Sequence, residues 1–249
     1  ILVVSVGAQS FRALMRRLRA LDLEGKTAVL CMKGLEAGTG LRLTQVFEEY
    51  APGTPVAIWV GPGHVQDFTR GVPNCMVIDG KSRKVKEFLV SAFSSSLIRF
   101  YYGCDLLGNE IGAASKNVVG IAAGMLDGLG KTALKGALMS RGTREIARLI
   151  QAMGGNGISA YGLAHLGDYE ATVFSPYSHN RRFGESFVKG EPYGELAEGV
   201  ATTAALLKLG ARYGVDLPIT RTVDAVVNGG ADPNRALSDL FLRGIKTEF

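Results

Sequence analysis

The sequence has few of the residues from which metal sites and disulfide frameworks are built. Its 249 residues include only three cysteines and three histidines. These are Cys31, Cys75, Cys104, His64, His165 and His179. No cysteine belongs to a CxxC pair and no two histidines have the spacing of a zinc-binding helix, so we expect no metal ion. We expect the three isolated thiols, each in an apolar stretch, to be reduced and buried in a cytoplasmic protein.

Long hydrophobic runs and blocks of charge are also missing. No apolar run reaches the ~20 residues that a membrane-spanning helix needs, and no signal-peptide pattern is present. Charged residues make up 20% of the chain and leave a net charge of +5, with residues 81–86 the nearest thing to a basic block. Aromatic and basic residues do not interleave as they do on nucleic-acid-binding surfaces. We therefore expect a globular protein without a membrane span or a nucleic acid partner, whose mild positive charge suits an anionic small substrate.

Residues 1–103 alternate between strand and helix patterns. Apolar runs predict strands at residues 1–6, 27–34, 55–62, 75–79 and 97–102, the first of them buried on both faces. Amphipathic patterns predict helices at residues 10–21, 39–50 and 82–95, and a short helical piece that ends at residue 70. This alternation predicts a mostly parallel sheet covered on both sides. The segments Ser5–Ala8, Lys33–Glu36 and Gly61–Gly63 should then meet at the carboxyl edge of the sheet, where ligands bind in such folds.

Strand patterns stop at about Asp105. Helical patterns follow at residues 106–128, 132–153, 195–213, 219–227 and 233–243. Residues 155–194 are irregular and rich in glycine, serine and tyrosine, which in a compact helical domain indicates functional loops. We therefore divide the chain into an α/β part, residues 1–104, and an all-helical part, residues 105–249.

The most unusual stretch is GNEIGAASKNVVGIAAGMLD, residues 108–127. At 3.6 residues per turn one narrow stripe contains Asn109, Gly112, Lys116, Gly120, Ala123 and Asp127. Each glycine inside a helix costs about 1 kcal/mol relative to alanine, so the stripe needs a reason. One explanation is close helix packing with the lysine reaching solvent. The other is a reactive lysine held over a small substrate, and the spacing does not decide between them.

Four further segments contain groups suited to chemistry, each with an ordinary alternative. Lys33 follows a predicted strand and is placed to bind an anion or a polarised carbonyl, although most lysines are simply exposed. The Gly-Pro-Gly at residues 61–63 lets backbone N–H groups face a ligand, but it also marks ordinary turns. Asp168, with Thr172 four residues on, can hold a lysine in place or cap a helix. Residues 180–182, Asn-Arg-Arg, suit phosphate oxygens or form a solvated loop.

Taken in order, these segments resemble the NAD(P)-dependent glycerol-3-phosphate dehydrogenases over essentially the whole chain. The matching motifs are KGLEAGTG (33–40), GP followed by RGVP (61–73), GxxxKNVxxIAAGxxDGLG (112–130), RG (141–142), AHLGD (164–168), SxxSxNRRFGE (175–185), EGV (198–200) and DLPIT (216–220). The resemblance implies a Rossmann-type part, partial at residues 1–104, followed by a helical catalytic part. It also implies NAD or NADP as cofactor, and interconversion of dihydroxyacetone phosphate and sn-glycerol 3-phosphate, a precursor of glycerophospholipids.

The resemblance also implies a role for each matched position. Lys116 would protonate the substrate oxygen at C2 as hydride arrives, with Lys33 and Asp168 as the other catalytic residues. Substrate contacts would come from Asn117, Thr172, Asn180, Arg181 and Gly61. Cofactor contacts would come from Ser5, Val6, Lys33, Arg181 and Glu198. The expected partners are a small phosphorylated substrate and, for assembly, a second copy of the chain.

The sequence departs from this family pattern at several positions. The glycine-rich first turn that cradles a pyrophosphate is absent, and Ile1 lies within an apolar run, so two or three βα units of the family either lie upstream or are missing. His179 stands where the family has arginine, and Ala201 where it has a basic residue. These departures support an alternative hypothesis, a non-catalytic relative that binds a phosphorylated metabolite. Within the enzyme class the alternative is a dehydrogenase of another small hydroxy acid, although residues 180–182 suit a phosphate ester better.

Overall fold

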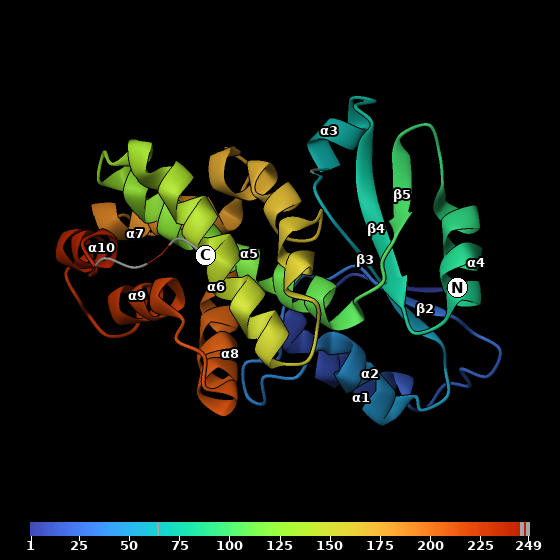
Figure 1. The fold of residues 1–249 in the computed structure, drawn as a ribbon. Helices are drawn as coiled ribbons and strands as arrows, with labels where there is room; N and C mark the ends of the chain where they lie inside the picture. Colours follow the sequence, from blue (N-terminus) through green and yellow to red (C-terminus); the bar gives the residue numbers. More distant parts are fainter. Residues whose placement is uncertain (64, 245–246, 248–249) are drawn as a thin grey trace.

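The computed structural model describes residues 1–63, 65–244 and 247, so His64 and most of the last five residues of the predicted helical part lie outside it. A five-stranded sheet and its helices come first, and a bundle of helices follows (Figure 1). The strands are β1 (Leu2–Val4), β2 (Ala28–Leu30), β3 (Val56–Val60), β4 (Asn74–Gly80) and β5 (Ile98–Tyr102). The helices beside them are α1 (Phe11–Leu18), α2 (Leu43–Tyr50), α3 (Val65–Thr69) and α4 (Arg83–Phe93). The bundle contains α5 (Leu106–Gly128), α6 (Lys135–Ala152), α7 (His179–Lys189), α8 (Glu198–Tyr213), α9 (Pro218–Val227) and α10 (Pro233–Phe241).

The sheet has the strand order β1-β2-β3-β4-β5 and is mostly parallel, as the alternation of patterns predicts. One pair departs from this, because β3 and β4 run antiparallel. The connection between them contains only α3, whose five residues span about 7.5 Å. So short a helix does not return the chain to the start of β3, and β4 therefore runs back along its neighbour.

Both faces of the middle of the sheet are covered, but the first strand is not buried as predicted. Phe11 of α1 and Phe47 of α2 pack on one face, and Leu89 of α4 packs on the other. Val3 in β1 remains 50% exposed. The prediction of a strand buried on both faces was wrong here, because β1 lies at the edge of the described sheet and α4 covers β3, β4 and β5 instead.

Two other local predictions need correction. The second predicted helix begins at Leu43 rather than at residue 39, because Gly40 adopts a φ of +74° and Arg42 is extended. The predicted burial of the cysteines was also wrong, since Cys31 and Cys75 are half-buried and Cys104 is exposed.

Helix α5 is the centre of the helical part. Every residue from Gly108 to Leu126 is buried, because α6, α7, α8 and α9 all pack around it. A helix that is apolar or small on all sides is expected in such a position. Its first turns also contact the α/β part, since Asn109 donates to Asp79 of β4 over 2.7 Å and Glu110 accepts from the backbone N–H of Thr44 in α2 over 3.0 Å. Among the described helices, none is long and apolar enough to cross a lipid bilayer.

The segment at residues 155–194 is less irregular than predicted, because it contains α7. Ser178 caps the start of this helix by accepting from the backbone N–H of Arg181, and Gly190 ends it in the left-handed conformation. Helices α5 and α7 touch backbone to backbone: an added Cβ at Gly124 would clash with the carbonyl of Arg181, and one at Gly184 with that of Ile121. The glycines of α5 therefore do serve close helix packing.

This contact makes a first prediction. Gly184→Ala should lower the free energy of unfolding by about 1–3 kcal/mol, because the methyl group has no space. Gly136→Ala is the matched control: Gly136 also lies in a helix, an added Cβ there meets nothing within 4 Å, and the change should raise stability by up to about 1 kcal/mol. Urea denaturation of both variants measures the difference, and equal effects would contradict the close approach of α5 and α7.

Candidate active site

Lys116 stands in the middle of α5, where its side chain is 8% exposed. Its Nζ lies 2.8 Å from Oδ2 of Asp168 and donates to Oγ1 of Thr172 over 2.7 Å. Burial lowers the pKa of Lys116 to about 8, against the opposing effect of the Asp168 carboxylate. The packing around Lys116 explains the glycines one turn to either side of it in the stripe: Gly112 leaves space for His165, and Gly120 leaves space for Thr172.

Lys33 reaches the same carboxylate from the sheet. It follows β2, and its Nζ donates to Oδ2 of Asp168 over 2.8 Å and to the carbonyl of Gly61 over 2.6 Å. Gly61 has a φ of +130°, which only glycine adopts readily, and this turns its carbonyl toward the lysine. Two ammonium groups from different parts of the chain thus share one carboxylate, which leaves a local net charge of +1.

Asp168 is completely buried at the end of a short 3₁₀ turn, Leu166–Asp168. Its Oδ2 serves both lysines, but its Oδ1 has no hydrogen-bond partner among the described residues. A buried carboxylate oxygen without a donor is costly. This oxygen is therefore an acceptor that the described residues leave without a donor.

Asn117 and Asn180 form a chain of amides beside the two lysines. Asn117 donates to the carbonyl of Lys33 over 2.8 Å and accepts from Asn180 over 3.1 Å. Asn180 in turn accepts from the backbone N–H of Gly199 over 2.8 Å. The chain joins the β2 end, α5, α7 and α8, so it fixes the position of Lys33 relative to Lys116.

The strand ends that we expect at one edge do meet there. Lys33 contacts Gly61, and an added Cβ at Gly34 would clash with the side chain of Ala8. Glu198, at the start of α8, lies over this edge and accepts from the backbone N–H of Ala8 over 3.0 Å. Its Oε2 is buried and has no hydrogen-bond partner among the described residues.

Arg181 is not brought to this cluster. Its guanidinium pairs with Asp127 at 2.6 Å and with Glu185 at 3.3 Å. Asp127 lies eleven residues beyond Lys116, about 16 Å along the helix. The neighbouring residues His179 and Arg182 point elsewhere, since both pair with Glu195 at the surface.

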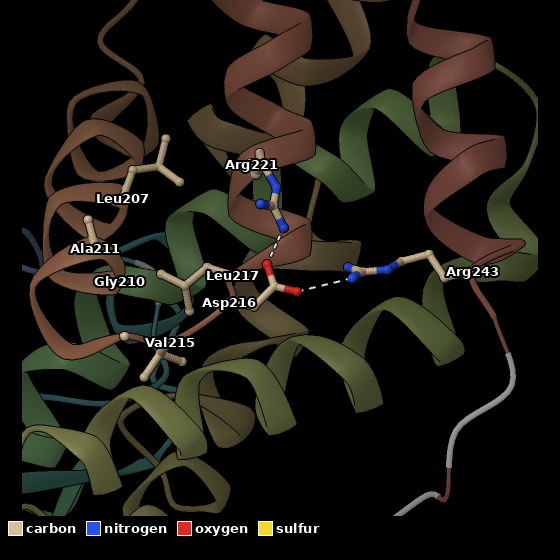
Figure 2. A pocket seen from close by; sticks show the side chains of 9 residues that line it. Leu207, Gly210, Ala211, Val215, Asp216, Leu217, Arg221 and Arg243 are labelled. Atoms are coloured by element: carbon tan, nitrogen blue, oxygen red, sulfur yellow. Dashed lines mark hydrogen bonds and ion pairs between the residues drawn. The ribbon is translucent and has the colours of Figure 1, made fainter.

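A separate pocket of about 670 Å³ lies at the junction of α8 and α9 (Figure 2). Leucine and glycine residues form its walls, and Asp216 at its rim pairs with Arg221 and Arg243. The residues predicted from the sequence to be functional do not line it. The cluster of buried charges around Lys116 and Asp168 is thus distinct from this pocket.

Comparison with known proteins identifies the family of the chain. Two family models match, one described as the N-terminus of NAD-dependent glycerol-3-phosphate dehydrogenase, at residues 1–86, and one as its C-terminus, at residues 105–238. The chain belongs to this family. A glycerol-3-phosphate dehydrogenase [NAD(P)+] of Desulfitobacterium hafniense is 37% identical over 99% of the chain and 72% of its own length. One of Agrobacterium fabrum is 38% identical over 88% of the chain and 68% of its length.

The fold is also shared with solved structures of the family. The crystal structure of glycerol-3-phosphate dehydrogenase from Coxiella burnetii matches 97% of this chain and 76% of its own, with a TM-score of 0.92 and 26% sequence identity. The resemblance found in the sequence motifs is thus confirmed at the level of family and fold.

The residues present in this family member fit a nicotinamide cofactor at the carboxyl edge of the sheet. The unpaired Oε2 of Glu198 is a buried acceptor that a ribose hydroxyl or a carboxamide N–H of the cofactor would satisfy. Gly7 and Gly34 lie beside this carboxylate, since an added Cβ would be 3.4 Å from Oε1 of Glu198 at Gly7 and 3.3 Å from Oε2 at Gly34. Ser5 and Val6 precede them at the exposed end of β1.

Sequence reasoning missed one pair of residues at this site. His165 appears there only as an isolated histidine without metal-ligand spacing, and Tyr169 is not singled out. Both are fully buried next to Asp168. Their spacing of four residues and the glycine at position 112 were signals of an interaction, but neither shows which elements face each other.

Proposed function

We propose that the chain interconverts dihydroxyacetone phosphate and sn-glycerol 3-phosphate with NAD or NADP, and that Lys116 transfers the proton at the C2 oxygen. Relatives of this name cover nearly the whole chain. The observation that carries the proposal is the buried cluster of Lys116, Lys33 and Asp168, with one carboxylate oxygen left for a ligand. When bound, the nicotinamide cofactor supplies or accepts the hydride.

The ammonium of Lys116 is equipped for this proton transfer. An ammonium has three N–H donors, and Asp168 and Thr172 take two of them. The third is available to the substrate oxygen, where a positive charge in a water-poor site stabilises a developing alkoxide. In the oxidation direction the neutral amine accepts the proton from the hydroxyl group, and a pKa of about 8 allows both forms near neutral pH.

The other residues of the cluster bind and orient the substrate in this proposal. Lys33 likewise has one N–H left beyond Gly61 and Asp168, and Oδ1 of Asp168 accepts from a substrate hydroxyl. Asn117 and Asn180 each use one amide hydrogen within the protein and have a second for substrate oxygens. Thr172 acts by holding Lys116.

The predicted contact of Arg181 with phosphate stays a prediction. A contact with phosphate or pyrophosphate would require its guanidinium to leave Asp127 and Glu185. Its geometry favours holding the start of α7, and with it Asn180, against α5. Glu198, Ser5 and Val6 remain the residues proposed for the cofactor, together with Lys33 at the edge between cofactor and substrate.

The pH dependence of the two directions tests the role of Lys116. Reduction needs the ammonium, so its kcat/KM should be constant at neutral pH and fall tenfold per unit above about pH 8. Oxidation needs the amine, so its kcat/KM should rise with pH and level off above the same value. The measurement is NAD(P)H oxidation with dihydroxyacetone phosphate, and NAD(P) reduction with glycerol 3-phosphate.

Turnover with either cofactor supports the proposed dehydrogenase activity. Absence of turnover in a folded protein that binds glycerol 3-phosphate by calorimetry without nicotinamide would replace it with the non-catalytic binding function. Turnover with the same pH dependence in both directions would leave the activity standing and remove Lys116 as the proton donor.

Location and assembly complete the proposal. We place the protein in the cytoplasm, where its three free cysteines would stay reduced, and assign it a homodimer. Sedimentation of the purified protein tests the second statement, since one chain of this sequence has a mass of 26.4 kDa.

A further inference from the structure

His165 and Tyr169 form a buried pair that the proton transfer does not use. Both side chains are 0% exposed. Nδ1 of His165 lies 2.8 Å from the carbonyl oxygen of Gly112, and Nε2 lies 2.7 Å from the hydroxyl of Tyr169. A carbonyl can only accept, so Nδ1 carries the proton and Nε2 accepts from Tyr169. Burial lowers the pKa of His165 to about 4, which keeps this neutral form at working pH.

The pair is attached to the catalytic helix one turn before Lys116. The carbonyl of Gly112 is the one to which the backbone N–H of Lys116 is directed in an α-helix. An added Cβ at Gly112 would lie 3.0 Å from that of His165, so the histidine stands directly on α5. The hydroxyl of Tyr169 also lies beside Gly142 of α6, where an added Cβ would be 3.1 Å from it.

Asp168 lies between these two anchors in a segment that regular structure does not hold. The backbone forms a three-residue 3₁₀ turn at Leu166–Asp168 and a π turn at Glu170–Phe174. Such short elements are not stable by themselves. The two lysines require the carboxylate at 2.8 Å, and one of its oxygens has no described partner to fix it. The position of Asp168 therefore depends on what holds the residues around it.

We propose that His165 and Tyr169 are positioning residues, which hold Asp168 at the distance from Lys116 at which the carboxylate keeps the ammonium charged. For its effect on catalysis the inference rests on the proposed role of Lys116. Among the described residues, the titratable groups that act on Lys116 are Asp168, Lys33 and His165. His165 stays neutral and Tyr169 has its pKa raised by burial, so neither changes charge where Lys116 titrates.

Tyr169→Phe is the test, because it removes one hydroxyl and keeps the ring. Asp168 should then move away from Lys116, and the pKa of Lys116 should fall by about one unit. The kcat for reduction should fall about tenfold at slightly alkaline pH with KM nearly unchanged. The alkaline limb of its pH profile should be displaced to lower pH by about one unit. Tyr50→Phe is the matched control, since its hydroxyl accepts from Arg12 and Arg16 outside the site.

A measurement without turnover separates this inference from the proposed function. Competitive acetylation by acetic anhydride at a series of pH values, read by mass spectrometry of peptides, gives the titration midpoint of Lys116 directly. A lower midpoint in Tyr169→Phe and an unchanged one in Tyr50→Phe supports the inference, even in a chain without activity. An unchanged midpoint in folded Tyr169→Phe overturns it.

His165 provides a second route should Tyr169→Phe fail to fold. His165→Asn keeps a donor where Nδ1 stands and loses the acceptor for Tyr169. His165→Gln keeps an acceptor near Nε2 and loses the bond to Gly112. Both variants should lower the titration midpoint of Lys116. If His165 had a purely structural role, both variants would have a lower melting temperature but an unchanged midpoint.

Discussion

Lys116→Met should reduce kcat for the reduction of dihydroxyacetone phosphate by at least about a thousandfold. Methionine fills nearly the same volume but has no proton and no charge. General acid catalysis contributes about 10²–10⁴-fold and stabilisation of a developing oxyanion about 10²–10³-fold, and the substitution removes both. The fold should persist, because Lys33 still pairs with Asp168 and the side chain of residue 116 lies in an almost dry site. Steady-state kinetics beside circular dichroism measures both statements.

Lys135→Met is the matched control for the loss of a buried ammonium. Lys135 is 4% exposed and binds Asp127 at 2.6 Å, with Arg181 as a second cation on the same carboxylate. Its replacement should lower the melting temperature and leave kcat within about twofold, because Asp127 lies ~16 Å along the helix from Lys116. Undiminished kcat in Lys116→Met, or an equal loss in both variants, would contradict the catalytic assignment.

The sequence predicts the architecture well because its strongest signals are local. The pattern at residues 106–128 matches α5 residue for residue, since a long stretch of small and apolar residues between Asp105 and a glycine has few other structures. The mostly parallel sheet follows from the alternation of apolar runs and amphipathic stretches. The ordered motifs predict the family, which the matches at residues 1–86 and 105–238 confirm.

The features that the sequence patterns do not specify depend on contacts distant in sequence. Nothing local distinguishes β4 from another parallel strand, since its direction depends on how far α3 carries the chain. The charged stretch around Arg181 looks like a solvated loop, but two glycines let it pack as α7 against α5. Arg181 is then committed to Asp127, a pairing between residues 54 positions apart.

The cluster around Lys116 likewise combines features that the local sequence predicts with features that depend on distant contacts. Lys116 could be singled out because glycines around a helical lysine are unusual, and Lys33 because it follows a strand. That both bind one oxygen of Asp168 depends on the meeting of sheet and bundle. The assigned roles of these residues stay predictions until the variants are measured, which makes the shared carboxylate the most informative position to change.

Asp168→Asn should impair both catalysis and stability. Two ammonium groups would remain close together without a carboxylate, so the pKa of Lys116 should fall further below its present value of about 8. At neutral pH most of Lys116 would then lack its proton, and kcat for reduction should fall about 10²–10³-fold with its alkaline limb displaced to lower pH. Removal of one partner from a buried ion pair typically costs about 3–5 kcal/mol, so the free energy of unfolding should fall as well.

Asp127→Asn separates the two effects. Asp127 is also a nearly buried carboxylate that serves two cations, Lys135 and Arg181, but it lies outside the cluster. Its replacement should reduce the free energy of unfolding by a similar amount and leave the pH profile of reduction unchanged. In Asp168→Asn the repulsion from Lys33 favours loss of the Lys116 proton. Lower pH puts this proton back, so it should partly restore kcat in Asp168→Asn and have no such effect in Asp127→Asn. A pH profile in Asp168→Asn equal to that of the original chain would mean that Asp168 stabilises the fold without tuning Lys116.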